Sequence, residues 1–67
     1  MKDTDHVRGC LATLHRLEAG LADLQMQTTD EEAHDVYRQA CLKVRTVAGR
    51  LEGRLHELET EPPPLTN

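Results

Sequence analysis

Six side chains of this 67-residue chain could bind a metal ion: His6, Cys10, His15, His34, Cys41 and His56. Zinc knuckles and redox motifs use close pairs such as Cys-x-x-Cys, and metal sites in helical bundles use ligands that share one helix face. The chain has no Cys-x-x-Cys pair. His34 and Cys41 lie seven residues apart, which is two helical turns and too far for one ion to bind both easily. We expect no metal ligands and no cofactor.

The two cysteines could also form a disulfide. In an antiparallel hairpin with a short turn, positions whose numbers add to about 57 face each other. This register places Cys10 beside Val47. The position that faces Cys41 then lies about six residues, or about 9 Å along the helix axis, from Cys10. This separation is beyond the reach of a disulfide. We expect free thiols that pack as small apolar groups. The alternative is a small metal- or redox-responsive regulator that uses Cys10 and Cys41.

No group of residues suggests catalysis. The chain contains no serine, neither cysteine has an evident histidine with an orienting partner, and no glycine-rich phosphate loop occurs. We expect no catalytic residues and a protein that is not an enzyme.

Residues 36–51 contain no acid and carry four positive charges, from Arg38, Lys43, Arg45 and Arg50. This stretch is the best candidate for a nucleic-acid or anionic-lipid surface. However, the net charge of the chain is −4, and no aromatic side chain lies between Arg38 and Arg50 to stack on bases. The same register places Arg38 near Glu18. We therefore favour ion pairing between helices or between copies of the chain, and expect no binding to nucleic acid.

Two amphipathic helices must position these residues. Apolar residues recur at alternating steps of three and four, with Leu11 widening the stripe, at Val7, Cys10, Leu14, Leu17, Leu21 and Leu24. This pattern predicts a helix over about 5–27, capped by Thr4 or Asp5. Thr29 and Glu32 have the spacing of a capping box and predict the start of a second helix over about 30–60.

The second helix has its apolar stripe at Ala33, Tyr37, Ala40, Val44, Val47, Leu51, Leu55 and Leu58, with a shift toward Cys41 and Ala48. Three prolines from Pro62 end the helix. We expect residues 1–61 to form the helical hairpin and residues 62–67 to form a proline-rich flexible tail. Gly49 and Gly53 lie one turn apart, which suggests closely crossing helices or, as the alternative, a groove for a partner helix.

The fold class is therefore all-α, an antiparallel two-helix hairpin. Because two helices cannot cover both apolar stripes at this chain length, we expect two hairpins to pair into a homodimeric four-helix bundle with coiled-coil packing. No stretch is apolar enough for a membrane span or a signal peptide, and two cysteines are too few for a secreted disulfide scaffold. We expect a cytoplasmic protein.

Three segments resemble a small uncharacterised family of endospore-forming bacteria, number 1657 in the domain-of-unknown-function series. They are residues 24–33 (LQMQTTDEEA), 37–40 (YRQA) and 51–59 (LEGRLHELE), and the resemblance spans about residues 7–62. Met26 in the turn region and the Pro-Pro-Pro-Leu tail depart from its usual pattern. The resemblance implies a helical hairpin and an accessory role near the membrane proteins of spore assembly and germination. It supplies no functional residues.

We therefore interpret the chain first as a non-catalytic helical interaction module, a dimer with a possible protein partner near a spore membrane complex. A metal- or redox-responsive regulator is the second interpretation, and a nucleic-acid-binding protein is the third.

Overall fold

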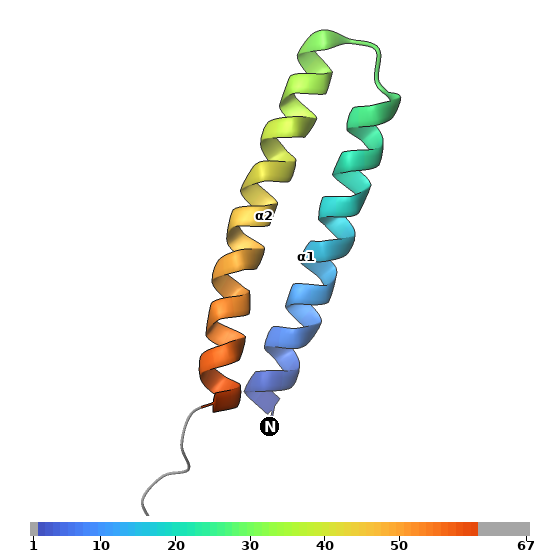
Figure 1. The fold of residues 1–67 in the computed structure, drawn as a ribbon. Coiled ribbons are helices and arrows are strands. Elements are labelled where there is room, and N and C mark those ends of the chain that lie inside the picture. Colours follow the sequence, from blue (N-terminus) through green and yellow to red (C-terminus); the bar gives the residue numbers. More distant parts are fainter. Residues whose placement is uncertain (1, 61–67) are drawn as a thin grey trace, which may run out of the picture.

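The computed structural model describes residues 2–60, with the backbone alone at Lys2. Two long helices, α1 (Lys2–Gln27) and α2 (Glu31–Thr60), are joined by three residues and run antiparallel over their whole length (Figure 1). The described residues contain no strand. The predicted all-α hairpin is confirmed, with the second helix ending at the expected residue. The predicted tail, residues 62–67, lies outside the described residues.

The first helix begins earlier than predicted. Thr4 and Asp5 were expected to cap its start, but α1 begins at Lys2, so both lie inside the first turns. Asp3 and Asp5 are placed in the first turn, where a negative charge interacts favourably with the helix dipole. Thr4 is buried, with 8% of its surface exposed. The residue that looked like a cap therefore belongs to the contact between the helices.

The second helix is capped by Asp30 and not by Thr29. The Asp30 Oδ2 atom accepts a hydrogen bond of 2.9 Å from the backbone N–H of Ala33, and the Asp30 carbonyl accepts one of 2.8 Å from His34 N–H. These two bonds are those of an N-cap residue at Asp30. The capping box predicted from Thr29 and Glu32 is therefore wrong by one residue, because threonine and aspartate are both good caps and lie next to each other.

The seam of α1 differs from the predicted stripe. The half-buried seam residues of α1 follow alternating steps of three and four, and the series includes polar residues: Val7, Leu11, Leu14, Glu18, Leu21 and Gln25, with Thr28 just beyond the end of the helix. Leu17 and Leu24, which were predicted to lie on the seam, are 48% and 45% exposed. The stripe was chosen by hydrophobicity, and α1 is rotated so that Leu11 takes the place that Cys10 was expected to fill.

On α2 the contact with α1 follows a regular heptad pattern of buried and half-buried residues, namely Tyr37, Cys41, Val44, Ala48, Leu51, Leu55 and Leu58. Cys41 and Ala48 are the buried apolar residues of the described chain, with 5% and 2% of their surfaces exposed. Val47, predicted to lie on the seam, is 50% exposed. The predicted shift toward Cys41 and Ala48 is confirmed, because both lie at the centre of the contact.

The glycines do not mark a close crossing within the hairpin. A Cβ atom added at Gly9, Gly20, Gly49 or Gly53 would meet no atom within 4 Å, apart from its own helix backbone. The expected close approach at Gly49 and Gly53 is therefore wrong for the contact between α1 and α2.

Replacing Asp30 by alanine removes the hydrogen bond to the Ala33 N–H. We expect Asp30→Ala to lower the free energy of unfolding by about 1 kcal/mol, measured by urea denaturation followed by circular dichroism. Thr29→Ala is the matched control, and it should leave the midpoint nearly unchanged. A larger loss for Thr29→Ala than for Asp30→Ala would contradict the assigned cap.

Candidate interaction surface

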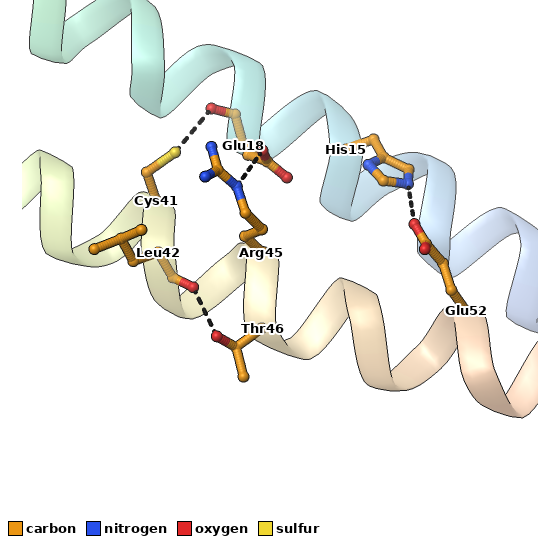
Figure 2. A network of polar contacts seen from close by, with 7 residues as sticks. All are labelled: His15, Glu18, Cys41, Leu42, Arg45, Thr46 and Glu52. Carbon is orange, nitrogen blue, oxygen red and sulfur yellow. Dashed lines mark hydrogen bonds and ion pairs between the residues drawn. The ribbon is translucent and has the colours of Figure 1, made fainter.

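One flank of the hairpin is closed by ion pairs between the helices. Arg8 pairs with Glu59, and His15 Nε2 lies 3.2 Å from Glu52 Oε1. Figure 2 shows the His15–Glu52 contact and a third one nearer the turn. These residues directly follow the seam residues of each helix in sequence, so they lie on the same side of the hairpin. We call this side the charged flank.

The third contact of the charged flank reaches into the seam. The Nε of Arg45 lies 3.1 Å from the Glu18 carboxylate, whose side chain is 23% exposed (Figure 2). The Cys41 thiol donates a hydrogen bond of 3.7 Å to the Glu18 backbone carbonyl. Glu18 thus occupies a seam position that an apolar residue would normally fill, and Arg45 neutralises its charge at the edge.

The opposite flank of the hairpin is apolar and exposed. It includes apolar residues that directly precede seam residues in sequence, with Ala33 one heptad before Ala40: Cys10, Leu17 and Leu24 on α1, and Ala33, Ala40 and Val47 on α2. We call this side the apolar flank. Leu17, Leu24 and Val47 are each about half exposed. Val36, one turn before Ala40 and beside this flank, is 62% exposed.

A shallow depression of about 410 Å³ lies next to the apolar flank on α2. It is lined by Leu42, Lys43, Thr46, Val47 and Arg50. The Thr46 hydroxyl donates to the Leu42 carbonyl at 3.0 Å, so its methyl group is the part left to contact a ligand (Figure 2). The accessible lining of the depression is mostly apolar, although Lys43, Thr46 and Arg50 contribute to it.

The positive charges of residues 36–51 divide into two groups. Arg38 donates to Asp35 at 2.8 Å, and Arg45 pairs with Glu18. The hydrogen bond from Arg38 is the main reason that the pKa of Asp35 is lowered. Lys43 and Arg50 have no ion-pair partner within residues 2–60. Glu18 was expected to lie near Arg38, but it pairs with Arg45, which lies one heptad farther along α2.

The pairing also corrects the predicted register. The residue numbers add to 59 in the Cys41–Glu18 contact, to 63 in Arg45–Glu18 and to 67 in Arg8–Glu59 and His15–Glu52, and the expected value was about 57. Cys41 was expected to lie level with residue 16, and it contacts Glu18, two residues farther along α1 and eight residues beyond Cys10. The separation of the two thiols, about 12 Å along the axis, excludes an intrachain disulfide without backbone movement.

The sequence analysis missed pairs of possible metal ligands that share a helix face, of which two are the most relevant. His6 and Cys10 lie four residues apart on α1, and Glu31 and His34 lie three apart on α2, so each pair shares a helix face. Among residues 2–60 no group of three His, Cys, Asp or Glu side chains is close enough to hold a metal ion. Each pair therefore offers two ligands at most from one chain, and a search for same-face pairs would have found both.

A comparison with family models finds one match, to the family described as "Protein of unknown function (DUF1657)", over residues 7–55. The chain belongs to this family. The match confirms the resemblance seen in the sequence, and the family description names no activity. No curated protein and no solved structure matches the chain. The function of this DUF1657 chain must therefore be inferred from its surface.

The matched family region covers the apolar flank and most of the charged flank. It includes the whole apolar flank and the pairs His15–Glu52 and Glu18–Arg45, whereas Glu59 lies outside it. Within the described residues of this DUF1657 chain, no helix is both long enough and apolar enough to cross a membrane. The most unusual chemical feature of its surface is the difference between the two flanks.

We expect the reduced protein to bind neither zinc nor copper tightly, because each same-face pair lacks further ligands. Titration with each metal, alone and with the Cys10→Ala, Cys41→Ala double variant, measures this. The double variant should lose about 1 kcal/mol of stability, because Cys41 is buried. Stoichiometric metal binding that disappears in the double variant would contradict the structural role of the thiols.

Proposed function

We propose that this chain is a non-catalytic helical interaction module whose folded unit is a homodimer. Two hairpins pack through their apolar flanks and form a four-helix bundle. The observation that carries the proposal is the asymmetry of the hairpin: ion pairs close one flank, and exposed leucine and valine side chains line the other.

The burial of side chains supports a partner. The leucines of the contact between α1 and α2 are only half-buried, and within residues 2–60 no large side chain is fully enclosed. A chain of this length needs a larger core, a disulfide, a metal or a partner to be stable. The two thiols of one chain are too far apart to bridge, so a partner is the simplest source of the missing burial.

The apolar flank can supply that burial. Fully burying an exposed leucine or valine side chain contributes about 1.5–3 kcal/mol, so a half-exposed one contributes about 1 kcal/mol. Leu17, Leu24 and Val47 of two copies together therefore contribute several kcal/mol. The positions of these residues are also typical of a four-helix bundle. They lie beside the seam and widen the apolar surface of the hairpin, and the charged flank stays exposed to water.

A charge on the apolar flank should dissociate the dimer. We expect Leu17→Glu to give a species that sediments as a monomer and loses much of its helix, because a buried unpaired carboxylate is strongly unfavourable. Met26→Glu is the matched control: Met26 is 83% exposed and belongs to neither flank, so this variant should stay dimeric. Equal behaviour of the two variants in sedimentation equilibrium would contradict the proposal.

We also propose a setting for the module. Cysteines that cannot bridge within one chain do not make the disulfide framework of a secreted domain, which favours the cytoplasm. The family resemblance favours an accessory role beside the membrane proteins of spore assembly or germination. A pull-down with the purified hairpin should retain such proteins from sporulating cells and not from growing cells. Recovery of the same proteins from both would contradict this setting.

A metal- or redox-responsive regulator is the second candidate, and one observation favours it. Cys10 is exposed, and His6 lies one helical turn before it on the same face. Two copies that brought these pairs together would offer four ligands, the number that zinc takes in structural sites. The metal titration described above separates this candidate from the purely structural role of the thiols.

A further inference from the structure

We infer that the depression on α2 is a docking site for an acidic amphipathic helix of a partner protein. The partner helix places an apolar side chain in the depression, between two carboxylates that lie two helical turns apart. This inference rests on the proposed interaction module and names the chemistry of the partner that the module binds.

The depression lies on the face of α2 that is turned away from α1. Leu42, Thr46 and Arg50 follow one another at steps of four residues along this face, with Lys43 and Val47 beside them. None of the five belongs to the seam, and Figure 2 shows the Thr46 side chain pointing away from α1. Val47 is shared with the apolar flank. In the proposed dimer a second copy packs against Val47 at one edge, and the other four lining residues lie outside that contact.

Two glycines extend this face toward the end of α2. Gly49 lies seven residues after Leu42, and Gly53 lies seven residues after Thr46. A Cβ atom added at either glycine would meet no atom within 4 Å beyond its own helix backbone and chain neighbours, so the surface there is open. A partner helix can approach closely at the glycines and contact the exposed side chains of Leu42 and Val47.

The charges around the depression favour an acidic partner. Lys43 and Arg50 lie two turns apart on one face, and neither has an ion-pair partner within residues 2–60. Asp35 and Glu57 lie one heptad before Leu42 and one heptad after Arg50, but each is already paired with an arginine three residues away. Two carboxylates seven residues apart on a partner helix match the spacing of Lys43 and Arg50 in either helix direction.

The same features favour a protein helix over a membrane or a nucleic acid. Recognition of an anionic membrane uses clusters of about four to eight basic residues, whereas the depression has two unpaired ones. Its apolar part is a local hollow and not a continuous stripe that could enter the acyl chains. No aromatic side chain lies between Arg38 and Arg50 to stack on bases.

An NMR titration tests the site. The probe is a designed helical peptide with two glutamates seven residues apart and a leucine four residues after the first. At low salt and peptide concentrations up to about 1 mM, we expect saturable shifts confined to the amides of residues 42–53. The same peptide with lysines in place of both glutamates is the control and should give none. Absence of saturable shifts, or shifts on another face, would overturn the site.

Two substitutions test how the peptide is recognised. Arg50→Glu should weaken binding about tenfold at low salt, because an attraction becomes a repulsion. Arg16→Glu makes the same charge change on the outer face of α1 and should leave binding unchanged. Gly49→Leu should abolish binding by filling the approach to the helix, and it should not lower helix stability, because leucine favours a helix more than glycine does. Equal effects of Arg50→Glu and Arg16→Glu would contradict the assigned contact.

Sedimentation of the same samples separates this site from the proposed dimer. A dimer that does not bind the peptide would overturn the docking site alone, whereas a monomer that binds it through residues 42–53 would overturn the dimer alone. Phosphatidylglycerol vesicles are the second probe. Vesicle binding that Arg50→Glu abolishes, without any shift on addition of the peptide, would show that the face binds a membrane and would overturn the assignment to a partner helix.

Discussion

The structure depends on one geometric constraint: two helices that touch along a single line can bury only one stripe of each. Both helices of this chain carry two overlapping stripes. On α1 the stripes share Val7, Leu14 and Leu21, and they differ at three places, where the seam has Leu11, Glu18 and Gln25 and the second stripe has Cys10, Leu17 and Leu24. The hairpin uses the first stripe and leaves the second on the surface. Half-buried leucines and an exposed apolar flank are therefore two results of the same constraint.

The ion pairs determine which flank of the hairpin can pack against another apolar surface. Exposed pairs such as His15–Glu52 contribute little to stability, because water solvates the separated charges nearly as well. They do make the charged flank expensive to dehydrate, so in the proposed dimer the second copy packs on the opposite side. Glu18 connects the two effects, since it occupies the seam and pairs with Arg45 at its edge. The electrostatics therefore contribute to specificity more than to folding.

The sequence predicted the helices well and their rotation poorly. The end of α2 near Thr60 followed from three prolines, and the short turn followed from the capping residues. The seam could not be read correctly, because leucine at position 17 is more hydrophobic than glutamate at position 18, although Glu18 lies on the contact. Hydrophobic pattern alone cannot tell a stripe that packs within the chain from one that awaits a partner.

The most direct test of this account is the thermal midpoint of the wild-type chain measured by circular dichroism at several protein concentrations. If folding requires a second copy, the midpoint rises with concentration over the micromolar to millimolar range, as mass action demands. A fully helical chain at low micromolar concentration, with a midpoint that does not change with concentration, would show that the hairpin is stable alone. That result would contradict the role assigned here to the apolar flank.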